Sequence, residues 1–189
     1  MRTAILIAAG VVVIGAGAAG GLAVGSLGEE TTTVTETVVV TETSTERAPP
    51  SGIPSAVETT RDALLEAAES GDYEALRTLI PESGFEYTFG GPVEGGPIGY
   101  WQELERTTDE RPLVSLAAIL RVPYTLSHGT YVWPFAYSLT GPADVTTYER
   151  NLLAPLGELR TLLIPGTGYL GWRAGIEPDG TWVFFVAGD

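Results

Sequence analysis

The sequence predicts an α+β fold: N-terminal helices packed on a curved, mainly antiparallel sheet that ends in a C-terminal hairpin, preceded by a single membrane-spanning helix. Three observations lead to this prediction. Residues 4–28 carry no charge, apolar residues recur at helical spacing after residue 53, and alternating apolar residues flank a turn signal at residues 177–180. These patterns are typical of a membrane span, of amphipathic helices and of a β-hairpin.

The glycines of the uncharged segment allow a second interpretation. Gly15, Gly17 and Gly20 have the spacing of a dinucleotide-binding turn, and they follow an apolar run. That motif requires a following helix to hold the pyrophosphate, but the threonines and valine of residues 29–36 are poor helix formers. As a helix, residues 4–28 would instead cover about 37 Å, enough for a bilayer core of roughly 30 Å. We therefore interpret residues 1–28 as an anchor and predict no cofactor.

The charges that flank the anchor predict its orientation. Arg2 precedes it and Glu29 and Glu30 follow it, which favours an N-terminus in the cytoplasm and the remainder outside. The predicted location is the cell membrane, with a single pass and the membrane contacted through residues 4–28. Small residues such as Ala18 and Ala23 leave open the alternative of cleavage as a signal peptide, which would release a secreted product.

The remainder divides into a linker and one domain. Residues 29–52 are rich in Thr, Val and Glu, with too few large apolar groups for a core, so we expect a disordered stalk. Residues 53–189 have the length of a single domain and contain 19 acidic residues against 8 arginines, a net charge of −11. This charge excludes nucleic acid as an expected partner. The chain has no cysteine, which excludes thiolate chemistry, and we predict no metal site.

Capping and turn residues predict most helix boundaries of the domain. A capping box at Ser55–Glu58 should begin a helix that Gly71 ends, and Asp72 should cap a second helix that stops before Pro81. Proline at a first helical position predicts further helices from Pro97 and Pro112. Asp144 or Thr146 should cap a helix through Leu153, and Thr146 and Glu149 have the spacing of a capping box.

Alternation of apolar residues predicts the strands. Phe85, Tyr87 and Phe89 should form a half-buried strand, and Pro134 confines a strand over residues 131–137 to an edge or a bulge. His128 should lie in an exposed hairpin turn. The residues Glu177-Pro178-Asp179-Gly180 predict the final hairpin, and a turn closed by a glycine bulge predicts the cross-strand pairs Ile176–Trp182, Gly175–Val183, Ala174–Phe184 and Arg173–Phe185.

Arg173 is the first candidate for a ligand-binding residue. It lies between Gly171 and Gly175 on one face of the predicted strand, so its guanidinium would stand in a groove floored by glycine. Such a group suits a carboxylate or phosphate ligand. The alternative is an ion pair with one of the acidic residues of the domain.

Aromatic residues supply the other candidates. A pocket for a sugar or a hydrophobic ligand could be lined by Tyr100, Trp101 and Tyr169, and by Trp133, Tyr137 and Trp172. Large aromatic residues are also common in protein cores, so a core position is the alternative for each of them. No nucleophile motif accompanies the only histidine, His128, and we predict no catalytic residue.

The order of elements resembles that of NTF2-like (SnoaL-like) domains over about residues 53–189. The resemblance rests on a leucine-rich helix, Gly71-Asp72, a short helix, the strand at residues 85–89 and a late set of strands ending in a long hairpin. It implies a cone-shaped α+β domain that serves as an enzyme, a ligand binder or a dimer module. The arrangement of anchor, threonine-rich stalk and small domain resembles membrane-anchored exported proteins of high-GC Gram-positive bacteria.

These expectations favour a non-enzymatic, membrane-tethered extracytoplasmic domain that binds a small molecule or a cell-envelope protein. Two alternatives stay open. One is an enzyme of hydrolase or isomerase type, with a carboxylate base in an NTF2-like cavity. The other is a structural module that forms a homodimer, for which an open sheet edge near Tyr131 would be the sign.

Overall fold

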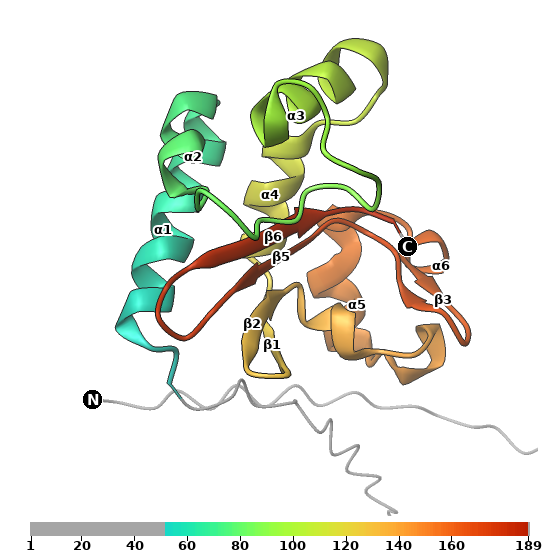
Figure 1. The fold of residues 1–189 in the computed structure, drawn as a ribbon. Helices are drawn as coiled ribbons and strands as arrows, with labels where there is room; N and C mark the ends of the chain where they lie inside the picture. The colour runs from blue at the N-terminus through green and yellow to red at the C-terminus, as the bar shows by residue number, and fades with distance from the viewer. Residues whose placement is uncertain (1–51, 189) are drawn as a thin grey trace, which may run out of the picture. The chain divides into compact units, whose positions relative to one another are not determined.

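The computed structural model describes residues 52–188, which belong to a single compact unit of mixed helix and antiparallel sheet (Figure 1). Its α-helices are α1 (Ser55–Ser70), α2 (Tyr73–Leu79), α3 (Gly96–Thr107), α4 (Pro112–Leu120), α5 (Thr147–Leu153) and α6 (Leu159–Leu162). Its strands are β1 (Thr125–Ser127), β2 (Thr130–Trp133), β3 (Leu163–Ile164), β4 (Gly168–Tyr169), β5 (Arg173–Ile176) and β6 (Trp182–Val186). The predicted α+β class and C-terminal hairpin are confirmed.

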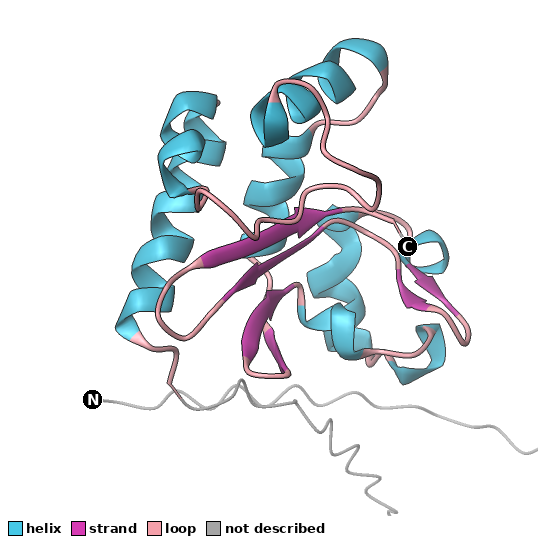
Figure 2. Cartoon of the chain, in the orientation of Figure 1, coloured by secondary structure: helices cyan, strands magenta, loops and turns pink. Residues whose placement is uncertain are grey.

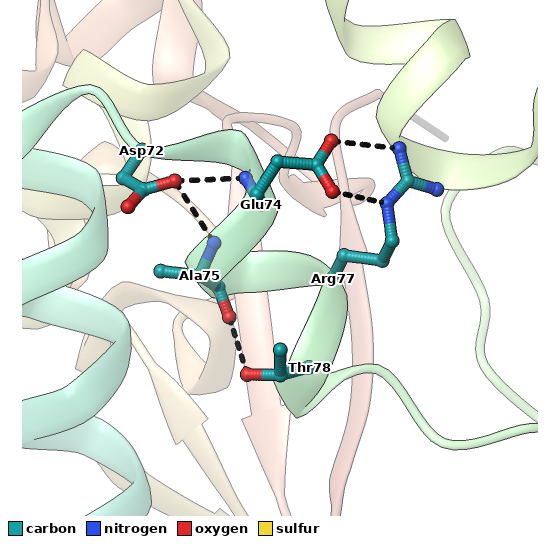
Figure 3. Close-up of polar contacts among 5 residues, drawn as sticks. All are labelled: Asp72, Glu74, Ala75, Arg77 and Thr78. Atoms are coloured by element: carbon teal, nitrogen blue, oxygen red, sulfur yellow. Dashed lines mark hydrogen bonds and ion pairs between the residues drawn. The ribbon is translucent and has the colours of Figure 1, made fainter.

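The two N-terminal helices are joined as the sequence predicts. Gly71 ends α1 with a left-handed φ of 74°, and Asp72 caps α2 by accepting hydrogen bonds from the N–H groups of Glu74 and Ala75, each at 2.9 Å (Figure 3). The predicted capping box at the start of α1 is wrong. The helix begins one residue earlier than expected, with Pro54 as its N-cap, so Ser55 is already helical and its side chain does not cap.

Four strands form the main sheet, in the order β1-β2-β5-β6 with every pair antiparallel (Figure 2). The β1–β2 hairpin turns at His128, which is exposed and has a φ of 51°, as predicted. Strand β2 ends at Trp133, before Pro134, and it lies between β1 and β5. The predicted edge position is therefore wrong, and Tyr131 pairs with residues on both sides. Strands β3 and β4 form a separate two-stranded sheet.

The β5–β6 hairpin closes with the predicted turn, but its register differs beyond the first pair. Ile176 pairs with Trp182 as expected, and a bulge then shifts Gly175 onto Phe184. The remaining pairs are Ala174–Phe185 and Arg173–Val186. The extra residue is Val183, whose carbonyl accepts from the N–H of Glu86 at 3.0 Å, outside the hairpin. A long-range partner of this kind cannot be read from the local sequence.

The segment around Glu86 is a single bridge and not the predicted strand. Glu86 pairs with Phe184 in parallel orientation along the outer edge of β6. Phe85 and Tyr87 pack against the core as the alternation predicts, whereas Phe89 is 57% exposed. The short segment therefore covers the sheet edge without extending the sheet.

Two clusters of buried side chains form the core. The larger one joins α1, α3 and α4 to the main sheet and contains Trp101, Trp182 and Phe185, whose rings lie 5.3–6.3 Å apart. The smaller one packs the region of α5 and α6 and contains Phe135, Leu153, Leu162, Leu163 and Tyr169. The capping box of α5 forms as predicted, with Thr146 and Glu149 bonded reciprocally.

The predicted anchor and stalk lie outside the described residues. Between residues 52 and 188, no helix combines the length and apolar character needed to cross a bilayer.

Candidate functional site

The structure brings together two of the four predicted ligand-binding residues. Arg173 and Tyr169 line the same cleft near the C-terminal end of β6. Trp101 is fully buried and contacts Phe85, Trp182 and Phe185, so it belongs to the core. Tyr100 packs on the outside of that core, with its ring 5.8 Å from the ring of Tyr87. Neither Tyr100 nor Trp101 contributes to the cleft of Arg173.

Arg173 begins β5 and is held by backbone and aromatic contacts. Its Nη1 donates to the carbonyl of Gly188 at 2.6 Å. The guanidinium carbon lies 5.2 Å from the ring centre of Phe89 and 5.8 Å from that of Tyr137. Both distances are in the range of cation–π contacts. The charge of Arg173 therefore lies near two aromatic rings, those of Phe89 and Tyr137, which are 57% and 39% exposed.

The predicted glycine-floored groove beside Arg173 is filled. A Cβ on Gly175 would overlap the ring of Phe184, and a Cβ on Gly171 would overlap the phenol of Tyr169. The two glycines therefore make room for aromatic side chains and do not leave the surface bare. The bulge at Val183 explains why the space above Gly175 is filled, because it places Phe184 opposite that glycine.

Tyr169 connects the site to the core. Its side chain is 6% exposed, and its hydroxyl donates to the carbonyl of Trp172 at 3.1 Å. Burial raises the pKa of the Tyr169 phenol well above its ordinary value, an effect that the nearby positive charge of Arg173 partly offsets. Tyr169 is therefore a neutral hydrogen-bond donor throughout the physiological pH range.

The cleft that contains Arg173, here called the Arg173 cleft, has a volume of about 400 Å³. Its lining mixes polar and apolar groups. It comprises Tyr137, Ser138, Leu139, Thr140, Gly166, Thr167, Gly168, Tyr169, Leu170, Arg173 and Gly188. Thr140 is already engaged, because its hydroxyl donates to Asp144 Oδ2 at 2.8 Å.

A second cleft, here called the Trp172 cleft, has a volume of about 480 Å³ and a more apolar lining. Leu162 comes from the smaller core cluster and Ile119 from the larger one, so the cleft lies where the two clusters meet. The whole lining comprises Glu110, Val114, Ser115, Ala118, Ile119, Pro155, Leu156, Thr161, Leu162, Tyr169, Leu170, Gly171, Trp172, Ala187 and Gly188.

The two clefts share a common border. Tyr169, Leu170 and Gly188 line both of them. The N–H of Gly188 donates to the carbonyl of Leu170 at 2.9 Å, which fixes the end of the C-terminal strand against the β4 region. The described end of the chain therefore forms part of the wall of each cleft.

Glu110 is the residue of this region that sequence reasoning missed. It lies in the loop before α4, and its Oε2 accepts from the indole Nε1–H of Trp172 at 2.9 Å. Trp172 also stacks on Phe185, with ring centres 4.5 Å apart. No local pattern links Glu110 to Trp172, because 62 positions separate them.

Two features of the described residues concern metal and acid–base chemistry. Within residues 52–188, no group of three or more His, Cys, Asp or Glu side chains could hold a metal ion. Glu149 is the only charged side chain in this range that is buried, and its carboxylate accepts bonds from the N–H and hydroxyl of Thr146. Its position is explained by the capping of α5.

Comparison of the chain with known protein families, with curated proteins and with solved structures found no match.

Proposed function

We propose that this protein is a membrane-tethered extracytoplasmic domain that binds a small molecule, without catalysing a reaction on it, in the paired clefts beside Tyr169. The pairing of the clefts is the observation that carries the proposal. Each has a volume within the range of ligand pockets in proteins, roughly 300–1,000 Å³, and the two share Tyr169, Leu170 and Gly188. Both clefts mix polar and apolar groups, and the Trp172 cleft is the more apolar of the two, which suits a ligand with both characters.

The uncharged length of residues 4–28 supports the tether, and the stalk predicted over residues 29–52 would hold the domain away from the bilayer. Cleavage of the anchor would yield the same domain as a secreted binder. The clefts favour a small molecule over an envelope protein, because they are concave, whereas a protein partner is more often met by a flat apolar patch.

The enzyme alternative requires a carboxylate that is desolvated inside a pocket. Glu110, which lines the Trp172 cleft, is exposed and fixed by an indole N–H, a geometry that suits recognition better than proton transfer. The dimer alternative required an open strand at Tyr131, and that strand has neighbours on both sides. Both observations favour the binding function.

The test is a thermal-shift screen of a small-molecule library with three substituted proteins for comparison. Ala118→Trp fills the Trp172 cleft and Thr167→Trp fills the Arg173 cleft. Gln102→Trp adds the same side chain at an exposed position of α3 outside both clefts. We expect ligands that raise the melting temperature of the wild type and of Gln102→Trp but not of at least one cleft-filling variant. Ligands that stabilise all four proteins equally would refute the proposed site.

A further inference from the structure

We infer that the Trp172 cleft takes a small organic cation with an apolar body, of the alkylammonium class. This inference rests on the proposed binding function and specifies the ligand of one of its two clefts. It follows from the charge, the aromatic ring and the aliphatic wall that meet in this cleft.

The charge of the cleft comes from Glu110. Among the described residues that line the cleft, Glu110 is the only one with a charged side chain. The indole N–H of Trp172 occupies one acceptor site of its carboxylate, which has about four such sites. The bond therefore holds the carboxylate beside Trp172 while leaving it able to accept from an ammonium group.

The ring and the wall complete the match. Trp172 lines the cleft, its indole N–H contacts this carboxylate, and its ring stacks on Phe185. Tryptophan is the aromatic residue that attracts cations most strongly. Aliphatic side chains supply the apolar surface for the ligand body, namely Val114, Ala118, Ile119, Leu156, Leu162 and Leu170. An alkyl chain would bury its methylene groups against them.

The negative net charge of the domain also favours a positively charged ligand. Residues 53–189 carry a net charge of −11, which attracts a cation and repels an anion over distances of about a Debye length. Arg111 is the nearest opposing charge in the sequence, and its Nη1 donates to the backbone carbonyls of Glu110 and Thr108 at 2.7 and 3.2 Å. Arg111 is not among the residues that line the cleft.

The experiment titrates the full-length protein, in nanodiscs of uncharged lipid, with three six-carbon probes: hexylammonium, 1-hexanol and hexanoate. The readout is the indole N–H signal of Trp172 in the ¹H–¹⁵N spectrum, with empty nanodiscs as the blank. The chain has four tryptophans, so Trp172→Phe identifies the signal by its loss. We expect hexylammonium to bind with a Kd on the order of 1 mM, the affinity that five buried methylene groups would supply.

Three comparisons test the role of charge. Glu110→Gln keeps an acceptor for the indole and removes the charge, and we expect it to weaken hexylammonium binding about fivefold. Glu82→Gln removes the same charge at an exposed position away from the cleft, and we expect no change. Hexanoate should bind at least about tenfold more weakly than hexylammonium.

Two results would overturn the inference, and they are separable from failure of the binding function. Equal binding of all three probes, blocked by Ala118→Trp, would refute the cation class while upholding the cleft. Binding of none of the probes would also refute the cation class. The binding function would then be upheld if ligands from the thermal-shift screen lose their effect in Ala118→Trp, and refuted for this cleft if they keep it.

Discussion

The indole Nε1–H of Trp172 donates to Glu110 Oε2 at 2.9 Å and so joins the entry of β5 to the loop before α4. This bond fixes two side chains of the Trp172 cleft that are far apart in sequence. We expect Glu110→Ala and Trp172→Phe each to lower the free energy of unfolding, and a double-mutant cycle to give a coupling of about 0.5–1 kcal/mol. Urea denaturation of the four proteins measures it. A coupling near zero would show that the bond does not persist in solution.

Arg173 should contribute to stability, because only a guanidinium can make its hydrogen bond and its two ring contacts at the same time. It donates to the Gly188 carbonyl and lies over the rings of Phe89 and Tyr137. We expect Arg173→Ala to lower the free energy of unfolding by about 1–2 kcal/mol. Arg173→Lys should recover only part of this loss, because the ammonium lacks the planar fork. An unchanged melting temperature in both variants would contradict a structural role and leave ligand contact as the explanation of this residue.

Because the Tyr169 phenol is buried, we expect the domain to lose stability at alkaline pH. Its folded pKa is raised by burial above the unfolded value of about 10, so the stabilisation is complete below pH 10 and is lost as the pH rises toward the folded pKa. Tyr169→Phe removes the bond to the Trp172 carbonyl and should cost about 1 kcal/mol at pH 8. At pH 11 the gap between variant and wild type should narrow. Melting temperatures at both pH values test this, and a gap that widens would contradict it.

Gly180 is needed for the docking of the hairpin tip on α1. Its φ is 92°, and a Cβ there would lie 2.9 Å from the carbonyl oxygen of Ala56. The hydroxyl of Thr60 also donates to the Gly180 carbonyl at 2.7 Å. We expect Gly180→Ala to destabilise the domain by about 1–3 kcal/mol, whereas Gly91→Ala, at a position with open space, should cost well under 1 kcal/mol. Equal melting temperatures of the two variants would contradict the close approach.

Local signals in the sequence were sufficient for much of the fold. The helix junction at Gly71 and Asp72, the capping box at Thr146 and the turn before Gly180 each depend on residues within a few positions of one another. Their chemistry is complete within the segment, so the sequence predicts them. The capping box expected at Ser55 is an exception, because Pro54 is the N-cap and Ser55 is already the first helical residue.

The features that could not be predicted depend on distant partners. The bulge at Val183 is tied to Glu86, nearly a hundred positions earlier, and it decides that Phe184 covers Gly175. The pairing of Glu110 with Trp172 has no local signature either. Of the predicted site residues, Arg173 and Tyr169 share a cleft, whereas Trp101 is buried in the core because its ring is large and apolar.

The proposed binding of a small molecule in the paired clefts beside Tyr169 can be observed directly. The decisive experiment is a crystal structure with the most stabilising compound from the thermal-shift screen. We expect the compound in the Trp172 cleft or the Arg173 cleft, in contact with Tyr169 or Leu170. A compound bound elsewhere on the domain, with both clefts filled only by solvent, would contradict it.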